Sequence, residues 1–269
     1  MSTAQLRRTV QDLKARASFA ARRPAIPEDR PEFARSLGIV PDPWQQELLS
    51  SEAPRVLLNC ARQSGKSTMA GVVALHKSLT VPGSLALILA PAERQAKELF
   101  SKVAQAYHAL GHVIPAESYR KLGMELTNGS RIEALPGTEK TVRGFSGVDL
   151  LIVDEASRVA DDLYYAVRPM LAISGGRLML LSTPYGKRGV FFEEWDGGEG
   201  WERYEVPANQ CPRIPASFLE EERAALPAWI YRQEYECSFE ETEDQVFGYD
   251  LVSAAITDEV TPLFPKEAS

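Results

Sequence analysis

The segment Cys60–Thr68 has the residue types and the spacing of a loop that binds phosphate groups. It fits the phosphate-loop pattern GxxxxGK(S/T), except that Cys60 stands where the first Gly is expected. Gly65 lets the backbone come close to a phosphate, and the N–H groups that follow lie at a helix N-terminus, which favours negative charge. Lys66 would neutralise the β- and γ-phosphates of a nucleotide, and the Ser67 hydroxyl would hold Mg²⁺. The predicted nucleotide-binding residues of this loop are Gln63, Ser64, Gly65, Lys66, Ser67 and Thr68.

Two acidic residues end an apolar run further along the chain, in Leu150-Leu-Ile-Val-Asp-Glu155. A buried strand would deliver both carboxylates to the carboxyl end of a parallel sheet, where a phosphate loop also lies. Asp154 would bind Mg²⁺ directly or through water, and Glu155 would orient and polarise the attacking water. Such a pair also occurs at ordinary strand ends. Because one strand separates it from the phosphate loop, it is the expected partner of Lys66.

A third apolar run, Leu178-Met-Leu-Leu, is followed by Ser182-Thr183-Pro184. We expect Ser182 and Thr183 to sense the γ-phosphate or to transmit its loss. The alternative is an ordinary strand end followed by a turn that the proline starts.

The elements that position these residues alternate between short apolar runs and helical stretches. Runs that are apolar on both faces are typical of buried parallel strands, so the sequence predicts an α/β fold with a mainly parallel sheet flanked by helices. Asn128-Gly129 between two short runs predicts a hairpin. The predicted strands are Val56–Leu58, Leu85–Ala90, Leu150–Val153 and Leu178–Leu181, and the clearest helices are Lys66–Leu79 and Ala92–Leu110.

The chain divides into four predicted segments. Residues 1–36 form a basic amphipathic helix, over 4–21, and a Pro-rich linker. The core of the fold covers 37–205, and a small helical lid covers 206–248, with one or two helices within 216–240. Residues 249–269 are a linker or tail.

Composition limits the possible classes of protein. The 269 residues have a net charge of -7 and a pI of about 5.2, which argues against a uniformly basic surface but leaves room for a local basic patch. The three cysteines are too scattered for a disulfide framework or a zinc site. No segment has the roughly 18 apolar residues of a membrane span, and we expect no signal peptide.

Several motifs together resemble the ATPase half of phage large terminases, over roughly residues 38–250. The phosphate loop Arg62-Gln-Ser-Gly-Lys-Ser67 lacks the first Gly, as theirs typically does. Similar segments are Pro43-Trp-Gln-Gln46, Pro91-Ala-Glu-Arg-Gln95, Leu181-Ser-Thr-Pro184, and Ile230-Tyr-Arg-Gln-Glu-Tyr-Glu236 followed by Phe239 and by Asp244-Gln-Val-Phe247.

The resemblance implies a P-loop NTPase fold of the RecA/ASCE type, with ATP and Mg²⁺ as cofactors. It implies that Gln45 reads the adenine edge with Trp44 packed nearby. Arg62 would contact the γ-phosphate in cis or act on a neighbouring subunit. Arg143 is similar in position to an arginine finger that acts in trans, and its alternative is an ordinary surface arginine.

The resemblance also implies partners: double-stranded DNA, a portal protein, a small terminase subunit and further copies of the chain in a ring, for example a pentamer. The expected location is the host cytoplasm, transiently at the procapsid portal. Arg120, Lys121 and Arg131 could grip DNA phosphates or form a solvated face. We expect no nuclease activity, because Asp250 and Asp258 are isolated and no nuclease strand is recognisable.

Two other functions stay open at this point. A helicase-like ATPase would need two RecA-like domains, and the sequence has room for one. A catalytically silent prophage remnant could still bind a portal or a small terminase subunit, although intact Lys66, Ser67, Asp154 and Glu155 argue against simple decay.

Overall fold

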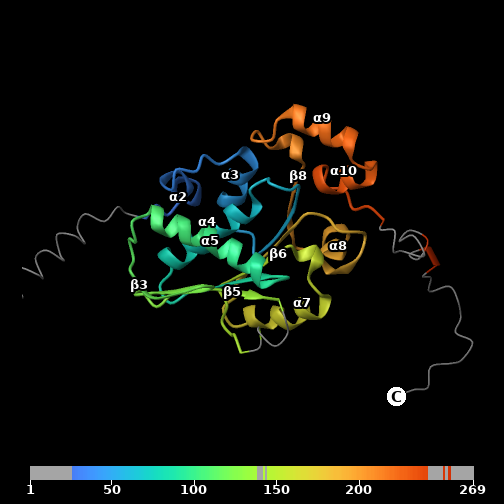
Figure 1. Ribbon diagram of the computed structural model, residues 1–269. Helices are drawn as coiled ribbons and strands as arrows, with labels where there is room; N and C mark the ends of the chain where they lie inside the picture. Colours follow the sequence, from blue (N-terminus) through green and yellow to red (C-terminus); the bar gives the residue numbers. More distant parts are fainter. Residues whose placement is uncertain (1–25, 138–141, 143, 242–250, 252–253, 256–269) are drawn as a thin grey trace, which may run out of the picture.

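The computed structural model of the protein describes residues 26–137, 142, 144–241, 251 and 254–255 (Figure 1). The predicted helix over residues 4–21, Arg143, the segment 244–247, Asp250 and Asp258 lie outside the described residues. Within the described part, no helix is long and apolar enough to cross a membrane.

The described strands form one eight-stranded sheet in the order β3-β4-β5-β2-β6-β7-β1-β8. Its pairs are parallel, except that β4 runs antiparallel to both β3 and β5. This confirms the predicted mainly parallel sheet and the hairpin at Asn128-Gly129. The strands are β1 (Arg55–Cys60), β2 (Leu85–Ala90), β3 (Ala116–Arg120), β4 (Gly123–Leu126), β5 (Arg131–Pro136), β6 (Leu150–Asp154), β7 (Arg177–Ser182) and β8 (Glu202–Val206).

Helices cover both faces of the sheet (Figure 1). The α-helices are α2 (Arg30–Ser36), α3 (Pro43–Ser50), α4 (Lys66–Thr80), α5 (Glu93–Ala109), α7 (Asp161–Val167), α8 (Gly189–Asp196), α9 (Ala216–Ala225) and α10 (Ala228–Tyr235). Short 3-10 helices are η1 (Ala156–Arg158), η2 (Arg168–Leu171) and η3 (Ala208–Gln210).

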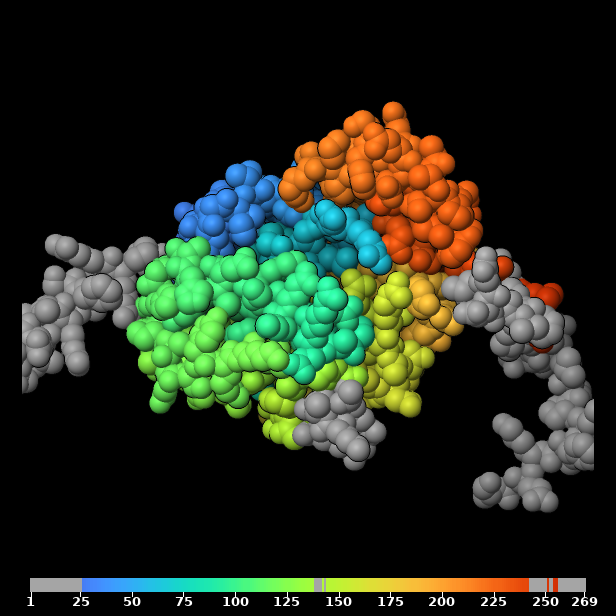
Figure 2. Space-filling model, viewed as in Figure 1, coloured from blue at the N-terminus to red at the C-terminus, as the bar shows by residue number. Residues whose placement is uncertain are grey.

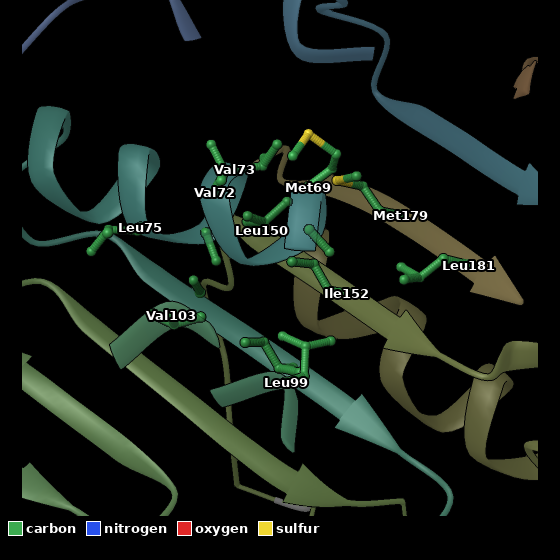
Figure 3. Packing of buried hydrophobic residues seen from close by; sticks show 14 of the residues in the cluster. Met69, Val72, Val73, Leu75, Leu99, Val103, Leu150, Ile152, Met179 and Leu181 are labelled. Atoms are coloured by element: carbon green, nitrogen blue, oxygen red, sulfur yellow. The ribbon is translucent and has the colours of Figure 1, made fainter. Parts of the chain in front are cut away.

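Alternate residues of the central strands belong to two separate cores. Leu150 and Ile152 of β6 pack with α4 and α5, whereas Leu151 and Val153 pack with α7 and α8. Figure 3 shows the first core, in which Met69 of α4 lies beside Met179 of β7. Because side chains alternate between the faces of a strand, a strand must have apolar residues on both faces to supply two cores.

The strand order brings three chain segments to one edge of the sheet. Strand β7 lies between β1 and β6, and all three are parallel. Their carboxyl ends therefore point the same way, with Asn59 opposite Ser182 and Asp154 opposite Leu181. The segments that leave these ends carry the residues on which the predicted chemistry depends.

Helices α9 and α10 lie together at one end of the molecule, within the segment predicted to be a lid (Figures 1 and 2). The Asn59 side chain donates a hydrogen bond to the Cys237 carbonyl oxygen, 2.8 Å away, and the Arg62 N–H donates to the Glu234 carbonyl oxygen, 3.3 Å away. Ala61 packs in a small core with Leu219 and Cys237. The lid is thus attached to the end of β1 and to the loop that follows it.

Candidate nucleotide-binding site

The phosphate loop connects the end of β1 to the start of α4. Gly65 has a φ of +97°, and a Cβ atom there would lie 2.8 Å from Gln45 Nε2, so both backbone conformation and space select glycine. Cys60, which stands at the usual glycine position, is fully buried in the core on the α4 side of the sheet. Burial raises the pKa of its thiol, so this side chain acts as a small neutral core residue.

Lys66 is the centre of the site. Its side chain is buried, and Nζ lies 3.3 Å from Thr183 Oγ1 and 3.6 Å from Glu155 Oε1. The three side chains come from the start of α4, the end of β7 and the end of β6. The structure therefore brings together the lysine, one sensor residue and the predicted catalytic carboxylate.

Ser67 and Asp154 form the second part of the site. Ser67 Oγ donates a hydrogen bond to Asp154 Oδ2 at 3.3 Å. A hydroxyl and a carboxylate are the protein ligands expected for Mg²⁺, which usually keeps several waters and takes substrate phosphates as its other ligands. The donor set therefore fits the predicted metal site. Burial raises the pKa of Asp154 to about 6, and the neighbouring Glu155 charge adds to the rise, whereas Lys66 opposes it.

Glu155 has a left-handed backbone conformation, with a φ of +50°, which is uncommon for a residue with a Cβ atom. Its N–H donates to Asp154 Oδ1 at 3.1 Å, so the strained residue is fixed to its neighbour. It directly precedes η1, where Ser157 Oγ lies 2.6 Å from Ser182 Oγ and 2.8 Å from the Thr183 carbonyl oxygen. Ser157 thus ties the segment after β6 to the end of β7.

The two predicted sensor residues have different surroundings. Thr183 contacts Lys66, as expected for a residue close to the phosphates, whereas Ser182 is fully buried and contacts Ser157. Ser182 therefore holds the end of β7 to the segment after β6, and Thr183 is the member of the pair whose side chain contacts Lys66.

Gln45 and Trp44 lie on α3, which packs against α4. Gln45 is 2% exposed: its Oε1 accepts from the Asp42 N–H at 3.0 Å, and its Nε2 donates to the Ser64 carbonyl oxygen at 3.2 Å. Trp44 is 8% exposed and belongs to the core. The Gln45 amide oxygen thus caps α3 and its amide nitrogen supports the phosphate loop, and the expected contact of Gln45 and Trp44 with adenine stays a prediction.

Arg213 is a residue of the site that the motifs did not reveal. It follows η3, and its guanidinium lies 2.7 Å from Asp42 Oδ2 and donates to the Ser64 carbonyl oxygen at 2.9 Å. Arg213 therefore connects the lid to the start of α3 and to the phosphate loop. Arg62 makes a second connection, because its guanidinium forms an ion pair with Glu234 of α10.

A cavity of about 560 Å³ lies over these residues. Beyond the predicted residues, α5 supplies Gln95, Glu98 and Lys102, and η1 supplies Arg158, whose guanidinium stacks 4.0 Å from the centre of the Tyr185 ring. The cavity is lined by Arg62, Gln63, Gly65, Lys66, Ser67, Thr68, Gln95, Glu98, Leu99, Lys102, Asp154, Glu155, Arg158 and Arg213. It combines several cations with a carboxylate pair, as polyphosphate hydrolysis requires.

The basic residues near the hairpin are partly engaged within the protein. Arg120 Nη2 lies 2.6 Å from Glu133 Oε1, and Lys121 Nζ lies 2.7 Å from Glu93 Oε1. Both side chains remain more than half exposed, so these ion pairs stabilise the fold little. Their suggested role in DNA binding stays a prediction.

Comparison with known proteins gives a consistent set of similarities. The model of a family described as terminase large subunit, T4likevirus-type, N-terminal, matches residues 57–253. The chain is 28% identical over 263 residues to the large terminase subunit of Thermus virus P23-45, covering 84% of this chain and 54% of that protein. It spans about half the length of the curated relatives it matches.

Solved structures show the same fold. The large terminase ATPase domain of Thermus phage P74-26 superimposes with a TM-score of 0.70 at 25% identity, covering 78% of this chain and 98% of that one. The large terminase of a thermophilic bacteriophage, solved in complex with ADP, superimposes with a TM-score of 0.64 at 10% identity, covering 74% of this chain and 53% of that one.

Proposed function

Because the chain belongs to the phage large terminase family and matches the N-terminal region of its members, we propose that it hydrolyses ATP and that this hydrolysis drives double-stranded DNA into a procapsid. The observation that carries the proposal is the convergence of Lys66, Ser67, Asp154, Glu155 and Thr183 at one edge of a parallel sheet. The cavity above them has the charges that a triphosphate needs.

Binding of ATP would exchange the partners of Lys66. The lysine ammonium now lies near Glu155 and Thr183, and the β- and γ-phosphates would take it over. Glu155 would then be free to orient a water molecule for attack on the γ-phosphorus, and the bond from that phosphorus to the β–γ bridging oxygen would break. A Mg²⁺ ion held by Ser67 and Asp154 would neutralise charge on the β- and γ-phosphates.

The partners of the motor are part of the same proposal. Packaging would require a ring of this chain at a portal in the host cytoplasm, with a small terminase subunit and DNA gripped through its phosphates. Once its ion pair with Glu234 opens, Arg62 would contact the γ-phosphate of the ATP bound to its own subunit, in cis, or to a neighbouring subunit, in trans. Membership of the terminase family favours this motor over a helicase-like ATPase.

The test is ATP hydrolysis with Mg²⁺, with and without double-stranded DNA, by the wild type, by Glu155→Gln and by the control Glu199→Gln, which changes an exposed carboxylate before β8. We expect Glu155→Gln to lower turnover about 100-fold or more while ATP still binds, and the control to match the wild type. Stimulation by DNA would support the motor. Failure of the wild type to bind ATP would refute the proposal.

A further inference from the structure

Two of the three histidines of the chain lie together outside the nucleotide-binding site. His108 is on the last turn of α5, and His112 lies between the end of that helix and β3. Nδ1 of His108 is 2.6 Å from Nε2 of His112, and both side chains are exposed. Neither residue lines the cavity over Lys66. We call these two residues the histidine pair.

The backbone that follows α5 brings the histidine pair together. The helix ends at Ala109, and Gly111 and His112 then have φ angles of +66° and +58°. Residues in the left-handed region end a helix and turn the chain away from its axis, which here returns the His112 ring to the last helical turn. A positive φ is uncommon for a residue with a Cβ atom, and such strained residues are frequent at functional sites.

Aromatic neighbours limit the freedom of both imidazole rings. The His112 ring stacks on Tyr107, with centroids 4.6 Å apart and an angle of 23° between the planes. Tyr107 is 1% exposed, and its hydroxyl donates to the Ile114 carbonyl oxygen at 2.8 Å. The His108 ring lies 5.9 Å from the Tyr119 ring. The two rings are therefore already ordered, so binding of an ion would cost little further side-chain entropy.

The spacing of the two ring nitrogens is close to that of a chelating pair. An imidazole nitrogen lies about 2.0–2.1 Å from a Zn²⁺ ion, so two nitrogens on one ion are roughly 2.9–3.4 Å apart when the angle between them is a right angle or a tetrahedral one. The two nitrogens here, at 2.6 Å, share one proton between the rings. An ion could take the place of that proton if the exposed rings moved apart by roughly 0.3–0.8 Å.

The kind of donor selects the kind of ion. Imidazole nitrogen suits Zn²⁺, Cu²⁺ and Ni²⁺, whereas Mg²⁺ prefers oxygen ligands. In the described part of the chain, no group of three or more His, Cys, Asp or Glu residues could hold a metal ion. The histidine pair would therefore supply two ligands, and water would fill the other positions. The thiols that could compete for such an ion are all buried: Cys60, Cys211 and Cys237.

We propose that the histidine pair is a binding site for one divalent late transition metal ion, such as Zn²⁺ or Cu²⁺. The bound ion would link the last turn of α5 to the segment that leads into β3. Because the unfolded chain does not hold the two rings together, the ion would also stabilise the folded protein. The site is separate from the one proposed for Mg²⁺ at Ser67 and Asp154, and it does not depend on nucleotide.

The test is a calorimetric titration of the untagged, nucleotide-free protein with Zn²⁺ in a buffer that contains excess Mg²⁺. The variants are His108→Gln, which suits a helix, and His112→Asn, which tolerates a positive φ. The matched control is Gln105→Ala, which changes another exposed side chain of α5. Loss of an outer partner of a metal ligand weakens metal binding about 10-fold to 100-fold, so loss of a ligand should weaken it at least about 10-fold in each variant. The control should bind one Zn²⁺ per chain, as the wild type does.

The Cu²⁺ complex supplies a second measurement, because Cu²⁺ binds nitrogen ligands more tightly than Zn²⁺ does. Its electron paramagnetic resonance spectrum should show coupling to two imidazoles in the wild type and to one in each variant. Wild-type protein that binds no Zn²⁺, or two variants that bind it as tightly as the wild type, would overturn the proposal. An equal loss in Gln105→Ala would overturn it too, since the effect would then come from the helix and not from the imidazoles.

Discussion

Asp154→Asn is expected to make the nucleotide-free protein more stable while it removes Mg²⁺-dependent function. Asp154 is buried at 6% exposure, and burial is the main cause that raises its pKa from the ordinary value of 3.8 to about 6. At 1.36 kcal/mol per pKa unit, this rise corresponds to a cost of about 3 kcal/mol for ionising Asp154 in the folded protein at neutral pH. Asparagine has the same shape, can keep the bonds to Ser67 and to the Glu155 N–H, and carries no charge.

The sign of the pH dependence follows from the raised pKa. Between about pH 4 and pH 6 the folded protein holds a proton on Asp154 that the unfolded chain has lost, so stability falls as pH rises through this window. Well above pH 6, where Asp154 is ionised in both states, the stability no longer falls for this reason. The variant has no such group, so it should equal the wild type near pH 4 and exceed it by up to about 3 kcal/mol at pH 7.

The assay is urea unfolding of both proteins at several pH values from 4 to 8 in a metal-free buffer, followed by the same measurement with Mg²⁺ and ATP. Nucleotide with Mg²⁺ should stabilise the wild type and leave the variant unchanged. A stability difference that does not vary between pH 4 and pH 8, or a variant that is less stable than the wild type at pH 7, would refute the reasoning.

Three further predictions concern the phosphate loop and its supports. Gly65→Ala places a Cβ atom 2.8 Å from a side-chain nitrogen at a positive φ, so we expect a loss of about 1–3 kcal/mol in stability, measured by urea unfolding, and weaker ATP binding by titration. Ser157→Ala removes one of the two donors to the Thr183 carbonyl oxygen, and should cost about 0.5–1.5 kcal/mol in stability and lower kcat more than it raises KM. Arg213→Met should weaken ATP binding and leave Asp42 without its cation, whereas Arg213→Lys should restore the charge but not the paired contacts, which titration of both variants would show.

The central part of the fold is predictable from the sequence for a simple physical reason. Strands β2 and β6 are buried at every position, and a continuous apolar run, which β6 has up to Asp154, is what such strands require. Two edge strands carry no such signal. The residues of β3 are mostly exposed, and β8, Glu202–Val206, alternates between charged and apolar side chains, so neither has a continuous apolar run.

The same distinction applies to the site. Lys66, Asp154, Glu155 and Thr183 could be predicted together, because parallel strands direct their carboxyl ends to one edge of the sheet. Arg213 could not, since its partner Asp42 is 171 residues away and its contacts depend on how the lid packs on the loop. Sequence motifs identify residues at fixed places on regular elements, whereas contacts between distant loops follow only from the packed structure.

The buried position of Lys66 accounts for the placement of Glu155 and Thr183 beside it. A lysine at 7% exposure needs partners, because an unpaired ammonium in the protein interior is costly. Glu155 and Thr183 supply the carboxylate and the hydroxyl oxygen, and Ser157 fixes the segments that carry them to each other. A phosphate that enters the cavity would compete with Glu155 and Thr183 for the Lys66 ammonium, so we expect phosphate binding to loosen these contacts. Phosphate binding and the freeing of Glu155 would then be coupled in this site, because both involve the same ammonium group.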